Sequence, residues 1–214
     1  MVLSTGRGQT LSASHPPGEH GIMDDLLRVG EPLSYAELMD LTLDGLVFRL
    51  SHSCWVPVGT RVDAELRARA LGAPRQTGLV ASHHSAHWIW WGVGTGPTTP
   101  EYTTRRRRRL RSAAQPWITY ERWVEGPDLA CVAGLAVTAP NRTLYDLTLL
   151  IHETFGDQSV AVKQLHRILA QVSDREKENF CSYLEAQYRR PHLRCLRSLA
   201  AAAIAPQRQP PTIG

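Results

Sequence analysis

Hydrophobic and polar positions near the N-terminus predict one helix followed by a pair of strands. Residues 34–43 begin with the capping-box signature Ser34–Glu37 and repeat leucine at helical spacing. From 46 to 58 apolar and polar residues alternate, as in a strand or a hairpin with a serine-rich bend in its middle. The preceding residues, 23–29, predict a short helical turn. A helix followed by such a hairpin is typical of the second half of a winged helix.

The middle of the chain predicts short strands mixed with two helices. One helix is expected at 61–72, with Leu66 and Ala70 facing inward, and another is expected to begin with Ser82 as its cap and to end at Gly92. Strands are expected at 79–80, 102–106, 116–122, 130–132 and 135–138, the last two joined by a tight connection at Ala133-Gly134.

From Pro140 onward the pattern is helical. Pro140 stands at the start of the first of these helices, and Ser173 with Glu176 begins a later one through a second capping box. The expected apolar stripes are Leu144, Leu147, Ile151 and Phe155, then Val162, Leu165, Leu169 and Val172, then Phe180, Leu184 and Tyr188. A last helix is expected from Pro191 through the alanine run 200–203.

Composition turns this pattern into a domain layout. The chain has 214 residues, of which 43% are hydrophobic and 21% charged, as in ordinary globular proteins. Short strands with helices before and after them predict an α+β fold. We expect a disordered arm at 1–21, a reduced winged-helix-like segment at 22–58, a mixed sheet-and-helix domain with a helical C-terminus at 59–205, and a flexible tail at 206–214.

Nothing in the sequence indicates a membrane or secreted protein. The longest apolar stretches are interrupted by His, Arg or Gly, and they fall short of the roughly 20 residues of a membrane span. The first 20 residues contain no apolar core like that of a secretory signal. The four cysteines are widely scattered, which argues against a disulfide framework. We therefore expect a cytoplasmic protein without a membrane partner.

Positive charge is concentrated in one short run. The formal net charge is +4, and the basic residues are almost all arginine. Six of them fall within seven residues: Arg105, Arg106, Arg107, Arg108, Arg109 and Arg111. This run predicts either a solvated edge strand, whose charges prevent aggregation, or a surface for phosphates or an acidic partner. Arg49, in the hairpin, is a further candidate for nucleic-acid or partner binding.

Three histidines are the obvious candidates for metal ligation. His83 and His87 are four residues apart and would share one helix face with His84 nearby. The sequence offers no third ligand at a suitable spacing. We therefore expect no metal, and we expect these imidazoles to contact the backbone or the neighbouring tryptophans.

Arg142 and Asp146 are the other charged pair that the pattern brings together. Their i, i+4 spacing places guanidinium and carboxylate side by side on a helix, and we favour a structural ion pair. Nucleophile-elbow, phosphate-loop and dinucleotide-binding motifs are absent from the sequence. We expect no catalytic residues and no cofactor.

The order of five segments resembles the AbiEi-type antitoxins and their actinobacterial relatives. The segments are the strand with Trp55-Val56-Pro57, the helix RARALG, the stretch ASHHSAHWIWWG, the basic run RRRRR and the stretch GLAVTAPNRTLYDL. Family members begin one helix with an S-x-x-S-A motif and another with R-T-x-x-D-L. The matching residues here are Ser82, Ser85 and Ala86, followed by Arg142, Thr143, Asp146 and Leu147.

The resemblance implies a winged helix joined to an antitoxin domain. It further implies an antitoxin that neutralises a cognate toxin of the AbiEii nucleotidyltransferase type and represses its own operon by binding operator DNA. Two alternatives remain open. One is a nucleic-acid-binding transcriptional regulator without a toxin partner, in which Arg49 and Arg105–Arg109 contact phosphates. The other is an atypical kinase acting on a partner protein, an activity described for some related antitoxins.

The chain departs from the family pattern at both ends of the resemblance. Only one full helix precedes the hairpin, and it displays Glu37 and Asp40, which would repel DNA phosphates. Many relatives continue into an endonuclease-like domain where this chain continues as helices. These departures weaken the DNA-binding expectation more than the antitoxin one.

Overall fold

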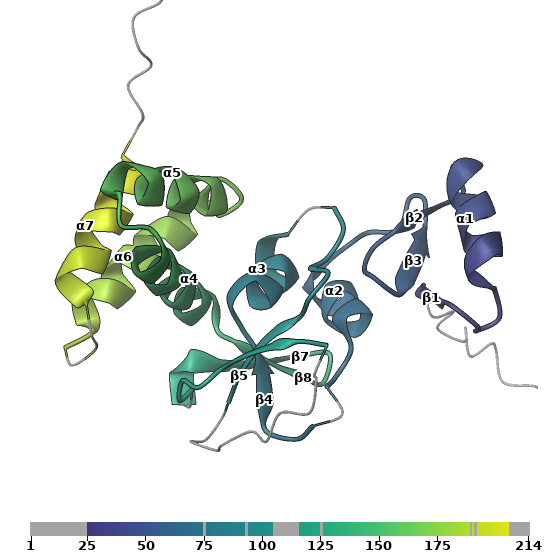
Figure 1. Ribbon diagram of the computed structural model, residues 1–214, viewed down its shortest axis with the longest axis horizontal. Coiled ribbons are helices and arrows are strands. Elements are labelled where there is room, and N and C mark those ends of the chain that lie inside the picture. The colour runs from purple at the N-terminus through teal and green to yellow at the C-terminus, as the bar shows by residue number, and fades with distance from the viewer. Residues whose placement is uncertain are drawn as a thin grey trace, which may run out of the picture.

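In the computed structural model the chain is an α+β protein, as its sequence predicts. The structure describes residues 25–74, 76–92, 94–104, 116–124, 126–188, 190 and 192–205. Within these residues a small N-terminal sheet with one helix, a central sheet and a group of C-terminal helices follow one another along the molecule (Figure 1). The predicted arm at 1–21 and tail at 206–214 lie outside the described residues.

The N-terminal sheet has three antiparallel strands in the order β1-β3-β2, with one helix. The elements are β1 (Leu27–Arg28), α1 (Tyr35–Leu43), β2 (Val47–Arg49) and β3 (Cys54–Pro57). Both hydrogen bonds of the predicted Ser34–Glu37 capping box are present at the start of α1. The helical turn predicted at 23–29 is wrong for Leu27 and Arg28. They form a strand because they pair with Trp55 and Cys54 of β3.

Strand β3 has both of its faces buried. Trp55 packs with Leu38 of α1 and Val47 of β2 on one side. On the other side, Cys54 and Val56 belong to the core of the central sheet. The predicted hairpin is confirmed, because β2 and β3 pair antiparallel. Strand β3 is the middle strand of the sheet, and it joins the N-terminal unit (the sheet β1-β3-β2 with α1) to the rest of the molecule. The described part of 22–58 contains one helix, and its assignment to a winged helix stays a prediction.

The central sheet has five strands in the order β6-β5-β4-β8-β7. They are β4 (Leu79–Ala81), β5 (Glu101–Thr104), β6 (Ile118–Tyr120), β7 (Leu129–Val132) and β8 (Leu135–Thr138). The neighbours β4–β8 and β5–β6 are parallel, whereas β4–β5 and the predicted hairpin β7–β8 are antiparallel. A 3-10 helix, η1 (Gly126–Asp128), leads into β7.

Two helices pack with this sheet in one core. They are α2 (Ala64–Leu71) and α3 (His83–Trp91). Leu66 and Ala70 of α2 are buried, as predicted, and join Ile89 of α3 and Val137 of β8 in the same cluster. Asp63 caps α2 by accepting a hydrogen bond from the Leu66 N–H at 2.9 Å.

The C-terminal helices enclose a second core of their own. They are α4 (Pro140–Thr154), α5 (Gln158–Leu169), α6 (Asp174–Ala186) and α7 (Leu193–Ile204). The predicted capping box at Ser173 and Glu176 is present. Phe180 and Leu184 are buried as expected, but Tyr188 is not part of their stripe. Helix α6 ends before it, and the side chain is almost fully exposed.

No helix among the described residues is long and apolar enough to cross a membrane.

Candidate functional site

Two neighbouring parallel strands bring the two motifs of the resemblance together. Ala81 of β4 lies opposite Val137 of β8, so both strands end at the same edge of the sheet. Ser82 then leads into α3, and Ala139 leads into α4. Segments far apart in the sequence thus start two helices side by side.

Thr138, the last residue of β8, connects these two helices. Its carbonyl oxygen accepts a hydrogen bond from Trp90 Nε1 of α3 at 2.9 Å and from Thr143 Oγ1 of α4 at 3.0 Å. The Thr138 and Thr143 hydroxyls also lie 2.7 Å apart, and both side chains are buried. Thr143 therefore fixes the start of α4 against the sheet rather than facing solvent.

The serines of the first motif are buried as well. Ser85 Oγ accepts a hydrogen bond from the Glu101 N–H of β5 at 2.8 Å. Ser82 stands at the N-cap position of α3, but its side chain makes no capping hydrogen bond among the described residues. The Glu101 carboxylate takes that role instead, because it accepts from the His84 N–H at 2.7 Å. The prediction that Ser82 caps α3 is therefore wrong, because Glu101 of β5 supplies the acceptor.

His83 is the most unusual residue of this junction. Its φ of +49° lies in the left-handed region, which costs a residue other than glycine free energy and often marks a functional position. The ring stacks on Tyr120 with centroids 3.7 Å apart, and Nδ1 lies 2.9 Å from Ser82 Oγ. Nε2 is buried and has no partner among the described residues. Burial, together with the nearby Arg122, lowers the pKa of His83 to about 3, so the ring is neutral.

The other two histidines make separate contacts. His84 Nδ1 lies 3.0 Å from a Glu101 carboxylate oxygen, and this hydrogen bond raises the pKa of His84. His87 Nε2 lies 3.2 Å from the Ile168 carbonyl oxygen, and burial lowers the pKa of His87. Within the part of the chain that the structure describes, no three donor side chains gather in a way that could hold a metal ion.

Arg142 forms the predicted ion pair with Asp146, and it also binds a second carboxylate. Its Nε lies 3.0 and 2.9 Å from the two oxygens of Asp146. Its Nη1 lies 2.8 Å from Asp128 Oδ2. Burial alone would lower the pKa of Arg142, but the two carboxylates outweigh it and raise the pKa. Because Asp146 is fully buried, the pair is part of the core.

Asp128 is the centre of a larger network that the sequence did not reveal. It also accepts hydrogen bonds from the hydroxyl of Tyr183 at 2.8 Å and from the guanidinium of Arg190. Burial favours the protonated carboxyl, but hydrogen bonds from Arg190 and Arg142 prevail and lower the pKa of Asp128. Arg190 in turn lies over the ring of Tyr145, 4.9 Å from its centroid. These residues come from separate elements, so no local spacing could have identified them.

An open cleft of about 970 Å³ lies over this network. Its walls are four residues before β7 (Arg122, Trp123, Pro127 and Asp128), the start of α4, one side of α6, and Gln187 and Arg190. Among the lining side chains are Arg122, Trp123, Asn141, Arg142, Tyr183 and Arg190. The carboxylates of Asp128 and Glu176 line the cleft as well, so it combines charged groups of both signs with aromatic and amide groups.

Arg49 does not present a free guanidinium. Its Nε donates to the Ser51 carbonyl at 3.1 Å, and its Nη2 donates to the His52 carbonyl at 2.6 Å. The guanidinium also lies over the Trp55 ring, 5.3 Å from the centroid. These contacts fold the side chain back onto its own hairpin. The basic run Arg105–Arg109 and Arg111 lies outside the described residues.

No protein-family model matches the chain, and a search of curated proteins found no relative. The expectation of an AbiEi-type antitoxin therefore depends on the motif residues themselves.

Proposed function

We propose that this protein is an antitoxin-like protein that binds and neutralises a toxin of the nucleotidyltransferase type. The motifs that resemble AbiEi-type antitoxins suggest this class of partner. The observation that carries the proposal is that both motifs begin helices at one edge of the central sheet, and that Thr138 bonds to both of these helices, to Trp90 of α3 and to Thr143 of α4. Ser85, Thr143 and Asp146 have structural partners there. A domain whose motif residues build its core is suited to acting through its outer surface, as a binding protein does.

The N-terminal unit offers such a surface for a protein partner. Leu43 at the end of α1 is 81% exposed, and Leu46 and Val58 are 57% and 60% exposed. The Val58 N–H donates to the Leu46 carbonyl at 2.9 Å, so these two residues are neighbours at one end of the hairpin. Exposed apolar side chains that lie together favour contact with another protein.

The charges around these apolar residues indicate the kind of partner. Glu37, Asp40 and Asp44 are exposed on α1 and at its end. In the described part of this unit, Arg28 Nη2 donates to the Arg69 carbonyl at 2.8 Å, and Arg49 Nη2 donates to the His52 carbonyl of its own hairpin. An enzyme that binds nucleotides presents positive charge to their phosphates, and an acidic surface complements it. The same acidic surface would repel DNA.

Co-expression with the neighbouring reading frame tests this proposal. A toxin-like nucleotidyltransferase frame beside the gene should arrest growth when expressed alone, and the full chain should relieve the arrest. Leu43→Asp should abolish this rescue without changing the circular dichroism spectrum, because Leu43 is exposed. Tyr188→Asp, at an exposed position far from α1, serves as the matched control and should rescue as the wild type does. A toxic neighbour that the wild-type chain does not relieve would contradict the proposal.

Repression of its own operon would be a further property of the same protein. It requires a DNA-binding surface, for which the run Arg105–Arg111 is the candidate that the sequence offers. Electrophoretic shift of the upstream DNA by the antitoxin alone, and by its complex with the toxin, measures this property separately from growth rescue.

A further inference from the structure

The geometry points to the cleft between η1, α4 and α6 as a binding site for a mononucleotide, held by its phosphates at Arg190 and by its base at Trp123. The assignment does not depend on the antitoxin proposal. The volume of about 970 Å³ is within the usual range of small-molecule sites, roughly 300–1,000 Å³.

The bottom of the cleft has more hydrogen-bond donors than the protein itself uses. Asp128 holds Arg142 and Arg190 side by side, since both guanidinium groups donate to its Oδ2. The Nη1 of Arg190 is buried and has no partner among the described residues. The Arg190 side chain lines the cleft and is 25% exposed, so a ligand oxygen can contact its exposed part. Guanidinium groups fixed in this way suit the oxygens of a phosphate.

The first turn of α4 adds positive potential to the same wall. The cleft is lined by Ala139, Pro140, Asn141 and Arg142. Ala139 occupies the N-cap position, and no side chain of the described residues caps the helix there. The amino end of a helix carries a partial positive charge, which reinforces the attraction of the arginines for an anion.

The carboxylates of the cleft are engaged by the protein. Asp128 accepts from two arginines and from Tyr183. Glu176 accepts from Trp91 Nε1 at 2.9 Å and from the hydroxyl of Ser173 in its capping box. Because these oxygens already have donors, a phosphate is a better ligand for this cleft than a cation.

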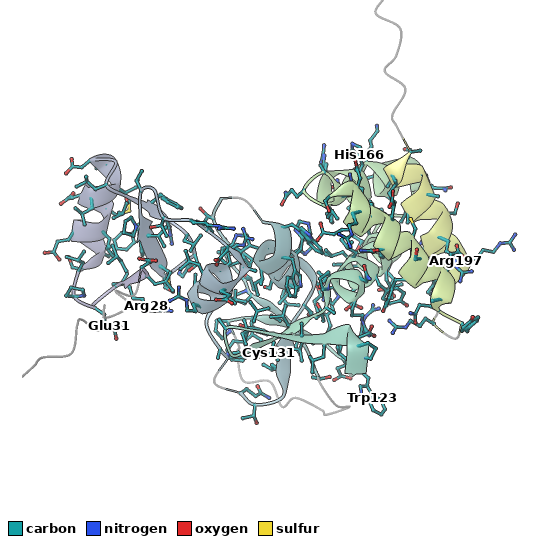
Figure 2. The ribbon with its side chains drawn as sticks, turned by 180° about the vertical axis from the view of Figure 1, so that it is seen from behind. Arg28, Glu31, Trp123, Cys131, His166 and Arg197 are labelled. Carbon is teal, nitrogen blue, oxygen red and sulfur yellow. The ribbon has the colours of Figure 1, made fainter. Side chains whose placement is uncertain are left out.

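Trp123 provides the second half of the site. Its side chain lines the cleft, is 62% exposed, and projects outward from the ribbon between β6 and η1 (Figure 2). An indole held in solvent beside a phosphate site is positioned to stack on a base, an interaction that every base can make. Asn141, Asn179 and Gln187 also line the cleft, and their amides can both donate to and accept from a base edge. These features favour a nucleotide over inorganic phosphate alone.

Isothermal titration of the full chain with ATP and with tripolyphosphate tests the two halves of the site separately. We expect ATP to bind more tightly than tripolyphosphate. Trp123→Ala should weaken ATP binding at least about fivefold and leave tripolyphosphate binding unchanged. Arg190→Gln should weaken both at least about tenfold. Tyr188→Ala and Arg175→Gln replace an exposed aromatic residue and an exposed arginine that do not line the cleft, and they should change neither.

The outcomes are decisive even where Arg190→Gln fails to fold, because the exposed Trp123 can be replaced without loss of structure. Equal affinity of the wild type for ATP and tripolyphosphate, or an unchanged ATP affinity in Trp123→Ala, would overturn the nucleotide assignment. Absence of binding by both ligands would overturn the site altogether. Growth rescue from the toxin has no influence on either result, so the failures of the two proposals are distinguishable.

Discussion

The guanidinium of Arg142 lies 2.8 Å from the carboxylate of Asp128, and this ion pair links the central sheet to the C-terminal helices. Asp128 ends η1 directly before β7, whereas Arg142 is in the first turn of α4. Tyr183 of α6 donates to the same carboxylate. The relative placement of the two cores therefore depends on a polar contact as well as on apolar packing.

Removing the partner of a buried charge should show how much this network contributes. Asp146→Ala leaves the Arg142 guanidinium buried with one carboxylate where it had two. We expect the free energy of unfolding to fall by about 3–5 kcal/mol, as when one member of a buried ion pair is removed. Chemical denaturation followed by circular dichroism measures the change.

An exposed ion pair provides the comparison for Asp146→Ala. Asp174 contacts Lys177 at 2.8 Å, but its side chain is 93% exposed. Asp174→Ala should leave the unfolding midpoint unchanged, because solvent screens exposed pairs. Similar small losses in both variants would show that Arg142 does not depend on Asp146.

Transfer of labelled phosphate from ATP to a partner, lost in a still-folded Asp146→Ala variant, would instead support the kinase alternative.

His83 should make the protein less stable as the pH falls below neutrality. Its pKa is about 3 in the folded state and about 6.5 when unfolded, so the unfolded chain binds the proton first. Stability from the neutral ring is present above pH 6.5 and is lost as the pH falls toward 3. His83 alone should contribute about 2 kcal/mol to the loss between pH 7 and 5, at roughly 1.4 kcal/mol per pH unit below 6.5. Denaturation at both pH values measures it.

Two variants separate His83 from its neighbour in this experiment. His83→Asn removes the titration and keeps a residue that tolerates positive φ, so the pH dependence between 7 and 5 should shrink. His84 has the opposite sign, because Glu101 raises its pKa. Its contribution is present below the unfolded pKa and is lost as the pH rises through the folded one. His84→Gln should therefore steepen the loss of stability toward acid, and a flatter profile would contradict this assignment.

Local features of the fold could be predicted from the sequence, and long-range pairings could not. The capping box at Ser34 and the tight connection at Ala133-Gly134 depend on residues a few positions apart, and both are present. The two-residue strand β1 exists because Leu27 pairs with Trp55, which no local pattern reveals. The parallel pairing of Ala81 with Val137 likewise depends on the whole fold.

The candidate site likewise contains one contact that the sequence predicts and several that it does not. The pair Arg142–Asp146 follows from helical spacing, and the structure contains it. Asp128, Tyr183 and Arg190 come from a 3-10 helix, a helix and the segment after it, so only tertiary packing brings them together. The cleft depends on that packing and could not have been inferred from the motifs.

A side chain at Gly92 should destabilise the fold. It ends α3, and a Cβ atom there would lie 2.3 Å from Cδ1 of Trp88 and 2.7 Å from the Trp88 carbonyl oxygen. Gly92→Ala should therefore lower the free energy of unfolding by about 1–3 kcal/mol, as overpacking does. Gly156→Ala is the matched control, because a Cβ there meets no described atom within 4 Å. Equal stability of the two variants would show that α3 adjusts around Trp88 without cost.

DNA binding, where it accompanies the antitoxin function, should depend on the basic run and not on Arg49. The Arg49 guanidinium already donates to Ser51 and His52, so Arg49→Gln should leave the affinity for the upstream DNA unchanged. Replacing Arg105–Arg109 by glutamine should weaken that affinity at every salt concentration. It should also reduce the slope of log K against log salt concentration by about 0.9 for each phosphate that the variant no longer neutralises. Fluorescence anisotropy between about 50 and 200 mM salt measures both quantities. A loss of affinity in a folded Arg49→Gln variant would place the DNA on the hairpin instead, and an affinity that does not change with salt would exclude phosphate binding.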